Sequence, residues 1–360
     1  MHAAATRTLQ ASPEQLAGLA PLAALSPDRL RELADIAVVE RAGRDSDVLR
    51  QHVAPGRSVF LIRGELLLVF AGGGTQVIVG GAEGGRHAIN KHPLPLKRTK
   101  AITDVELLSI EDEVLDILVT WDQVAQGETA GGASMARAVR SDSRLISGIF
   151  SLSNLRHGVF SQMPAASIDE LLKRFDRLPV HRGDTVIREG EEGDYYYVVE
   201  SGRCQVERMV GGAKMVLAEL KSGDAFGEEA LVSEAKRNAT VVVTADGELL
   251  RLRKQDFDQL LREPLLHRVN YEQGTEKVAQ GAVWLDVRYP SEYQYDKLPG
   301  AINVPLNEVR DVFTVLDKSK DYVAYCQSGR RSSAAAFLLA QRGFKVWLLE
   351  GGLWAAGRRN

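Results

Sequence analysis

The chain has 360 residues, of which 44% are hydrophobic and 26% are charged, and its formal net charge is −3, from 45 basic and 48 acidic residues. This length exceeds one ordinary domain, so we expect two or three. The composition excludes a disordered or fibrous chain, and the near-neutral charge gives no general attraction to nucleic acid or to acidic membranes.

The amino-terminal sequence and the number of cysteines indicate the cellular compartment of the chain. Ser12 and Pro13 predict the start of a helix, and no secretion signal or membrane-spanning apolar run of about 18 residues is found. Cys204 and Cys326 lie in different predicted domains, which argues against a disulfide and favours the cytoplasm. The seven histidines have no metal-site spacing, so we expect no metal.

Residues 1–125 and 149–271 show the same order of elements, which indicates an internal repeat. In the first copy Ser26 and Pro27 predict a helix start, and residues 58–64 and 106–110 predict strands. Residues 126–148 are glycine- and arginine-rich and are interpreted as a linker or a connecting helix.

The second copy has the clearer pattern. Residues 167–170 read as a capping box for a helix that continues to Phe175. Short alternating segments at 185–188, 196–199 and 204–207 are separated by glycines and predict strands. Many short strands with regular glycine turns predict an antiparallel barrel or jelly roll. We expect its final helix to run from Lys254 to about Val269.

Residues 226–241 follow these strands with a short helical segment and an arginine nine residues after a glutamate. Free backbone N–H groups at a helix start and a bidentate arginine would hold an anion. The segment resembles the phosphate-binding cassette of cyclic nucleotide-binding domains. The resemblance implies that Glu228 accepts from the ribose 2′-hydroxyl and that Arg237 binds the cyclic phosphate. The implied nucleotide-binding residues are Phe226, Gly227, Glu228, Glu229, Ala230, Arg237, Asn238, Ala239 and Thr240.

The base preference rests on a departure from the family pattern. Asn238 stands where alanine or threonine is common, and it could hydrogen-bond a base edge, which favours cyclic AMP while cyclic GMP stays open. The alternative for Glu228 and Arg237 is an exposed ion pair of little energetic weight. The first copy has no glutamate and arginine at this spacing between Gly80 and Lys100, so we expect it to bind no nucleotide.

Residues 272–360 alternate strand and helix patterns, which predicts a mostly parallel α/β sheet. Expected strands are 283–286, 301–304, 322–325 and 346–349, and the helix after Cys326 is expected to end at Gly343. Cys326 lies between the strand at 322–325 and that helix, where backbone N–H groups and a helix start would stabilise an anionic sulfur.

This part resembles the rhodanese (sulfurtransferase) family, from about Val278 to the end. The resemblance is carried by residues 284–288, 291–293, 298–305, 326–331 and 349–352 and by Trp354. Lys297 stands where the family usually has histidine. A cysteine phosphatase or arsenate reductase is a weaker alternative, because it needs arginine where this chain has Ser332.

The combined hypothesis is a sulfurtransferase that responds to cyclic AMP or cyclic GMP. Cys326 would carry a persulfide, with Arg330 and Arg331 supplying positive charge and with Asp286 and Arg288 as supports. The persulfide loop would be formed by Gln327, Ser328, Gly329 and Ser332.

The expected partners follow from the same hypothesis. They are a thiosulfate or persulfide donor, a thiol or cyanide-like acceptor, and a second copy in a homodimer. No helix-turn-helix follows the second barrel, which argues against DNA binding. The alternative function is a non-catalytic nucleotide receptor or sulfur sensor that acts by binding a partner protein.

Overall fold

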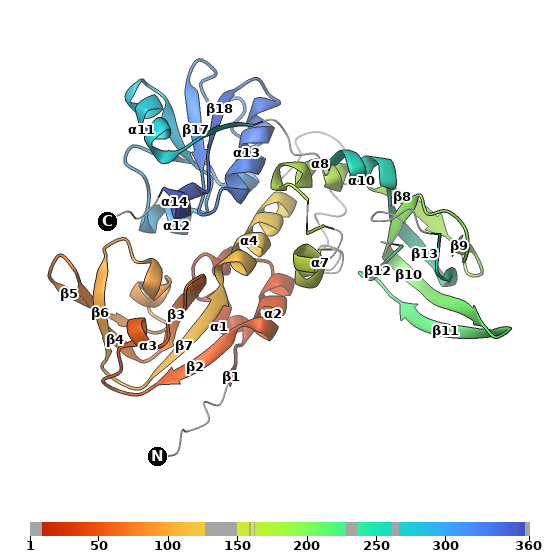
Figure 1. Cartoon of the computed structure of the whole chain (residues 1–360), viewed down its shortest axis with the longest axis horizontal. Helices are drawn as coiled ribbons and strands as arrows, with labels where there is room; N and C mark the ends of the chain where they lie inside the picture. Colours follow the sequence, from red (N-terminus) through yellow and green to blue (C-terminus); the bar gives the residue numbers. More distant parts are fainter. Residues whose placement is uncertain are drawn as a thin grey trace. The chain divides into compact units, whose positions relative to one another are not determined.

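The computed structural model describes residues 9–126, 150–157, 160–161, 163–227, 236–260 and 266–356 (Figure 1). Contacts between residues divide the chain into two compact units. The first unit comprises Met1–Asp122 and Arg288–Pro305, and the second comprises Gln123–Val287 and Leu306–Asn360. The predicted linker at 126–148 lies, except for Gln126, outside the described residues.

The first unit contains one β-rich region, the first β region (residues 9–111), and two short elements from later in the chain. Its elements are β1 (Leu9–Gln10), α1 (Pro13–Ala17), η1 (Leu22–Ala24), α2 (Pro27–Ile36), β2 (Val38–Ala42), α3 (Val48–Gln51), β3 (Arg57–Arg63), β4 (Glu65–Phe70), β5 (Thr75–Val79), η2 (Glu83–Gly85), η3 (Ile89–Lys91), β6 (Leu96–Ala101), β7 (Val105–Glu111), α12 (Pro290–Tyr295) and β16 (Ile302–Asn303). Helix α4 (Asp112–Gln126) follows β7 and continues into the second unit.

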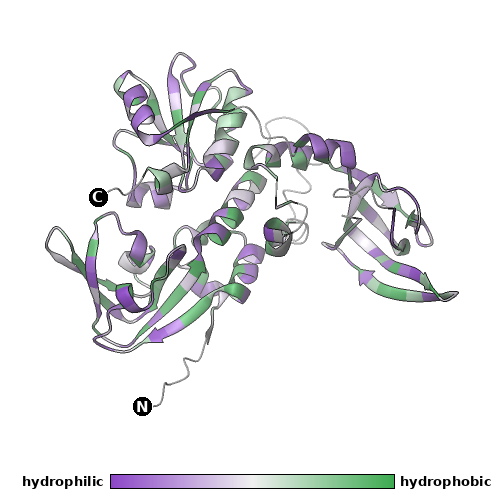
Figure 2. Ribbon diagram, viewed as in Figure 1, coloured by the Kyte–Doolittle hydropathy of each residue, from purple (hydrophilic) through white to green (hydrophobic). Residues whose placement is uncertain are grey.

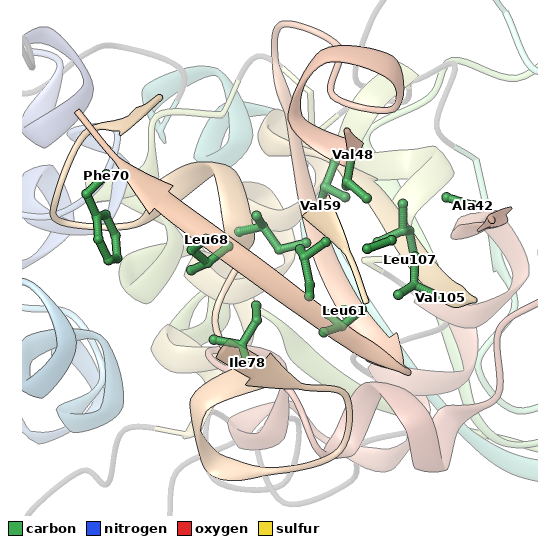
Figure 3. Close-up of a cluster of buried hydrophobic side chains, with 12 residues drawn as sticks. Ala42, Val48, Val59, Leu61, Leu68, Phe70, Ile78, Val105 and Leu107 are labelled. Atoms are coloured by element: carbon green, nitrogen blue, oxygen red, sulfur yellow. The ribbon is translucent and has the colours of Figure 1, made fainter. Parts of the chain in front are cut away.

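Two antiparallel sheets of the first β region enclose a shared core. Their strand orders are β1-β2-β7-β3 and β5-β4-β6. Figure 3 shows the core side chains, among them Leu61 from β3, Leu68 from β4 and Ile78 from β5. These three side chains are at most 4% exposed. Both predicted helix starts are confirmed, and at the first the Ser12 hydroxyl accepts from the Gln15 N–H at 3.3 Å.

The second β region (residues 163–260) lies in the second unit. Including the helix that precedes it, its elements are α7 (Leu152–His157), η4 (Ala165–Ser167), α8 (Ile168–Lys173), β8 (Asp176–Val180), β9 (Thr185–Ile187), β10 (Tyr195–Val210), β11 (Ala213–Leu220), β12 (Ala225–Phe226), β13 (Thr240–Arg253) and α10 (Lys254–Leu260). The strands pair antiparallel in the order β11-β10-β13-β8, with β12 on β10 and β9 on β13.

Three local predictions for this region are wrong. The segments on either side of Gly202 belong to one strand, β10, whose register against β13 shifts on both sides of that glycine. The capping box at Ser167 is absent, because Ser167 ends the turn η4 in helical backbone conformation and makes no side-chain cap. The following helix α8 ends at Lys173, before Phe175.

The hairpin of β10 and β11 is apolar along part of its length (Figure 2). Met215, Val216 and Leu217 of β11 are nevertheless 46%, 49% and 50% exposed. The buried core of this region is formed instead by β10, β13 and shorter strands and includes Val199, Val241 and Leu249.

The C-terminal region of the second unit is built on parallel strands. Its elements are β14 (His267–Val269), α11 (Tyr271–Ala279), β15 (Val283–Asp286), η5 (Leu306–Glu308), β17 (Asp321–Tyr325), α13 (Arg330–Ala340), β18 (Lys345–Leu349) and α14 (Gly352–Ala355). Neighbours in the order β14-β18-β17-β15 pair in parallel. Tyr322 to Tyr325 of β17 are all buried, as expected for a strand covered on both faces.

The four strands predicted between residues 272 and 360 are found within one residue of their expected ends, three of them here as β15, β17 and β18 and the fourth as β16 of the first unit. The helix predicted from Lys254 to Val269 is wrong at its end, because α10 ends at Leu260 in the described residues and His267–Val269 is the strand β14. Helix α13 ends at Ala340, and Gly343, with a φ of 80°, forms the turn that follows.

Candidate functional site

The Cys326 loop joins strand β17, which ends at Tyr325, to helix α13, which begins at Arg330. Gly329 adopts a φ of 99°, a conformation that side chains with a Cβ rarely adopt. This left-handed residue turns the chain from the strand into the helix within a few residues. The predicted strand, tight loop and helix are therefore present around the cysteine.

Two donors approach the Cys326 sulfur. The Gly329 N–H donates to Sγ at 3.1 Å and the Ser332 hydroxyl lies 3.5 Å from it. The Arg330 N–H donates instead to the Ser328 hydroxyl at 3.1 Å. Hydrogen bonds donated to a sulfur stabilise its anionic form, so the loop has the chemistry of an anion cradle.

Helix α14 holds this loop from the other side. The Leu353 N–H donates to the Cys326 carbonyl at 2.9 Å and the Trp354 N–H donates to the Gln327 carbonyl at 3.0 Å. A Cβ at Gly352 would lie 2.5 Å from the Cys326 carbonyl oxygen and 2.7 Å from the Gly329 nitrogen. Only glycine fits there, and its role in the site was missed although the Gly351–Gly352 pair was noted in the sequence.

The two arginines after the loop differ in burial. Arg331 is 2% exposed, and its Nη1 lies 3.5 Å from the Gln123 side-chain oxygen. Arg330 is partly exposed at the first position of α13. Positive charge therefore lies at the start of α13, both inside the protein and at its surface.

Cys326 itself is 0% exposed. A sulfur donor or acceptor can reach this thiol only if neighbouring groups move. The loop is thus chemically suited to bind an anionic sulfur, but access to it requires a conformational change.

The predicted supports Asp286 and Arg288 are both buried, with exposures of 0% and 2%. Asp286 pairs with Tyr325 in the parallel register of β15 and β17, directly before the cysteine. In the first unit, the Arg288 carbonyl accepts from the Asn303 side chain at 2.9 Å and its guanidinium donates to the Asp296 carbonyl. The contacts of Arg288 hold the backbone of residues 288–303 in place.

A pocket with a volume of about 220 Å³ lies in the second β region. It is lined by Ile187, Val206, Leu220, Ala225, Phe226, Gly227, Arg237, Asn238, Ala239 and Val241. The lining thus combines apolar side chains with one cation. Among the predicted nucleotide-binding residues, Glu228, Glu229 and Ala230 lie outside the described residues.

Arg237 is only 9% exposed and is positioned by backbone groups. Its Nη1 donates to the Gly227 carbonyl at 3.1 Å and its Nη2 donates to the Tyr195 carbonyl at 2.7 Å. Gly227 has a φ of 79°, and a Cβ there would lie 2.8 Å from the Arg237 Nη1. The glycine is therefore required both for the turn and for the close approach of the guanidinium.

The three residues after Arg237 lead into β13, which begins at Thr240. Asn238 is exposed, whereas Ala239 is 8% exposed and lines the pocket. The Thr240 hydroxyl accepts from the Glu189 N–H at 3.0 Å, which ties the end of the cassette to the loop after β9. A guanidinium beside a partly apolar pocket fits a ligand that has a phosphate and a flat ring.

In the first β region the corresponding segment has a different arrangement. Arg86 pairs with Glu83 at 3.1 Å, and the His87 ring stacks on Tyr295 with centroids 3.7 Å apart. Burial, followed by the positive charge of Arg86, lowers the pKa of His87. These residues line a cavity of about 330 Å³ that differs from the Arg237 pocket in holding an ion pair and a ring stack.

Two other features are absent from the residues that the structure describes. In the ranges given above, no group of three or more His, Cys, Asp or Glu residues could hold a metal ion. No helix among those residues combines the length and apolar character that crossing a membrane requires.

Two family models match this chain. The model of the cyclic nucleotide-binding domain matches residues 177–263, and the model of the rhodanese-like domain matches residues 270–356. The chain therefore contains a cyclic nucleotide-binding domain followed by a rhodanese-like domain. Both resemblances inferred from the sequence are confirmed.

Relatives include regulatory subunits of cAMP-dependent protein kinases and also cGMP-dependent protein kinases. The chain is 42% identical over 81 residues to the cAMP-dependent protein kinase regulatory subunit of Debaryomyces hansenii, covering 22% of this chain and 17% of that protein. It is 24% identical over 241 residues to the cGMP-dependent protein kinase egl-4 of Caenorhabditis briggsae, covering 66% and 29%. The chain thus spans less than a third of the length of these relatives.

Among solved structures, the regulatory domain of Toxoplasma gondii PKA with cAMP is similar, at 17% identity and a TM-score of 0.28. The alignment covers 69% of this chain and 90% of that one. The names of the relatives include both cAMP and cGMP, so the comparisons do not separate the two nucleotides.

Proposed function

We propose that this chain is a sulfurtransferase whose Cys326 carries a persulfide and whose transfer rate responds to a cyclic nucleotide bound beside Arg237. The observation that supports the chemistry best is the pair of donors at the Cys326 sulfur, the Gly329 N–H at 3.1 Å and the Ser332 hydroxyl at 3.5 Å. Both lie at Sγ, which carries the negative charge when Cys326 is the thiolate nucleophile of the first step and the thiolate leaving group of the second.

The reaction has two balanced steps. The Cys326 thiolate attacks the outer sulfur of thiosulfate, the S–S bond of thiosulfate breaks, and sulfite leaves with the electron pair. An acceptor such as cyanide or a thiolate then attacks the outer sulfur of the persulfide, and the Cys326 thiolate is regenerated. Arg330, at the protein surface, is the group that would attract an anionic donor, while Arg331 supplies buried charge.

The nucleotide would be held by residues of the second β region. Arg237 would bind the cyclic phosphate in a bidentate pair, and Gly227 leaves room for its guanidinium. Glu228 would accept from the ribose, with Glu229, Ala230, Ala239 and Thr240 completing the site. Asn238, exposed at the pocket edge, favours cyclic AMP over cyclic GMP in this proposal.

Control of transfer would act through access to the thiol. Cys326 is 0% exposed, so a change that opens its surroundings would change the rate. We infer that nucleotide binding repositions α10, the terminal helix of the second β region. Coupling between sites typically changes an affinity by about 5- to 150-fold, or about 1 to 3 kcal/mol.

The same burial favours a second candidate function. A thiol that no donor reaches would leave the rhodanese-like domain as a sulfur sensor or a partner-binding module, with the nucleotide-binding domain as the receptor. This function predicts that no sulfur is transferred under any nucleotide concentration.

The test measures thiocyanate formation from thiosulfate and cyanide by the full chain, with and without cyclic AMP or cyclic GMP. We expect a rate that changes with nucleotide and that is absent in Cys326→Ser. Cys204→Ala is the matched control and should keep the rate, because Cys204 lies in the core of the second β region. Full activity of Cys326→Ser would rule out the enzyme hypothesis.

Calorimetry tests the nucleotide site separately. Arg237→Glu places a negative charge against the phosphate, so no heat of binding is expected for either nucleotide. Unchanged affinity of this variant would mean that Arg237 does not contact the phosphate.

A further inference from the structure

Helix α13, which begins beside Cys326, contacts the turn η4 at the start of the second β region. Ala165 and Ala166 of η4 are buried, and so are Ala334 and Ala335 of α13. Small side chains on both elements allow their backbones to approach closely. The first turn of α13 places the Ser332 hydroxyl 3.5 Å from the sulfur. A shift of η4 that moves α13 would therefore move this hydroxyl relative to Cys326.

A buried ion pair joins the same two parts of the second unit. Asp169 of α8 binds Arg310, and their side chains are only 4% and 9% exposed. Lys173, one turn along α8, lies 2.8 Å from the other carboxylate oxygen of Asp169. Arg310 follows η5, which also contacts α13. Separating two buried charges that are in contact is costly, so the pair fixes α8 relative to this segment.

Helix α8 is connected in turn to α10. Arg174, which caps the end of α8, donates to the Asp256 carboxylate at 2.7 Å and to the Gln259 side chain at 3.0 Å. The two helices also contact each other. A displacement of α10 is therefore passed to α8 through side chains that are already in contact.

The start of α10 is linked to the nucleotide pocket. The Lys254 N–H donates to the Asp194 carbonyl at 2.9 Å, next to Tyr195, which pairs with Arg253 at the end of β13. The Tyr195 carbonyl accepts from Arg237 at 2.7 Å. A phosphate bound in a bidentate pair uses the same guanidinium nitrogens, so its binding alters the contact that holds Tyr195.

We propose that nucleotide binding is transmitted to Cys326 through α10, α8 and the contact of η4 with α13, and that Asp169 and Arg310 are the positioning residues of this path. The proposal rests on the function proposed above and names how its two sites are coupled. Neither residue lies in the Arg237 pocket or in the Cys326 loop. Their loss should therefore uncouple the sites while both sites stay intact.

The experiment compares the full-length wild type with Arg310→Met. Hydrogen exchange of the α13 amides and the rate of thiocyanate formation are measured with and without cyclic AMP, and calorimetry measures nucleotide binding. We expect cyclic AMP to change α13 exchange in the wild type and the rate by about 5-fold or more. In Arg310→Met, cyclic AMP should change neither α13 exchange nor the rate of thiocyanate formation. Nucleotide binding and the rate without nucleotide should be retained. Lys173 keeps a cation beside Asp169, so the fold should survive the change.

Two variants serve as controls. Arg310→Lys keeps a cation at this position and should restore most of the response, which a general loss of packing would not allow. Arg177→Met removes an arginine of the same unit, paired with Glu200 at 2.6 Å, and should respond like the wild type.

Three results would separate the hypotheses. A wild-type nucleotide response in folded Arg310→Met would overturn the path. Bound nucleotide without any change in wild-type α13 exchange would also overturn it. If nucleotide changed α13 hydrogen exchange in the wild type but not the rate of thiocyanate formation, the path would be supported. The proposal that nucleotide controls sulfur transfer would then be contradicted.

Discussion

The two cysteines of this chain are equally buried but have different surroundings. Cys204 is 1% exposed in the core of the second β region, packed among apolar residues such as Val199 and Val243. Burial raises the pKa of its thiol from 9.0 to about 11. Cys326 is 0% exposed, yet a backbone N–H and a hydroxyl approach its sulfur.

The two cysteines therefore differ in their hydrogen-bond donors and not in their exposure, and the proposed function assigns the reactive role to Cys326, which has the donors. A thiol surrounded by hydrocarbon is held in its neutral form, while donors aimed at the sulfur favour the anion. Each donor around Cys326 depends on the loop geometry set by Gly329 and Gly352. Changes in that geometry should make Cys326 behave more like Cys204.

Gly352→Ala should have the largest effect on this difference. Its Cβ would lie 2.5 Å from the Cys326 carbonyl oxygen, 2.7 Å from the Gly329 nitrogen and 2.8 Å from the Gln327 carbonyl oxygen, all backbone atoms that cannot rotate away. A displacement of about 1 Å at a reacting group can cost about 100-fold in rate. We expect a loss of this order in sulfur transfer from thiosulfate to cyanide.

Gly343→Ala is the matched control for that variant. Gly343 also has a positive φ, of 80°, but a Cβ there meets nothing within 4 Å. It should strain its own turn and leave the transfer rate nearly unchanged. Equal rates for the two variants would show that the loop tolerates movement of its backbone.

Ser332→Ala should have a smaller effect, because it removes only one of the two donors. The hydroxyl lies 3.5 Å from the sulfur, and a typical hydrogen bond contributes about 1 kcal/mol, or about 5-fold in rate. Ser333→Ala is the control, since the Ser333 hydroxyl donates to the Arg330 carbonyl at 2.7 Å. Stopped-flow measurement of sulfite release would compare them. Equal rates for the two variants would remove Ser332 from the cradle.

The cysteine loop could be predicted from sequence because its determinants are local. A buried strand, a glycine and a helix start within a few residues fix the direction of the backbone, and the strand ends were predicted within one residue. Arg237 was predicted as an anion-binding residue from its spacing of nine residues after Glu228 and from the resemblance of residues 226–241 to the phosphate-binding cassette. Local backbone preferences and motif spacing are sufficient for such features.

Long-range contacts could not be predicted in this way. Asp169 and Arg310 are 141 residues apart in the chain, and nothing in either neighbourhood indicates a partner. Strand β14 was expected to be helical, because three residues with His267 and Arg268 show no strand pattern and become a strand only by pairing with β18. The burial of Cys326 likewise depends on elements that the local sequence does not reveal.

The smallest predicted effect concerns Cys204 and the pH dependence of stability. Its folded-state pKa of about 11 lies above the ordinary 9.0, so the folded chain holds the thiol proton more tightly than the unfolded chain. As pH rises above about 9, the unfolded chain loses this proton first, and stability is lost progressively toward pH 11. Below pH 9 the contribution is fully present.

Cys204→Ala removes this contribution and should flatten the decline. Tyrosines and lysines titrate in the same range, so the informative quantity is the difference in melting temperature between the wild type and Cys204→Ala, measured from pH 8 to pH 10.5. We expect this difference to shift steadily in favour of the variant as pH rises. Parallel curves would mean that Cys204 ionises as readily in the folded chain as in the unfolded one, and the contrast between the two cysteines would then lose its basis.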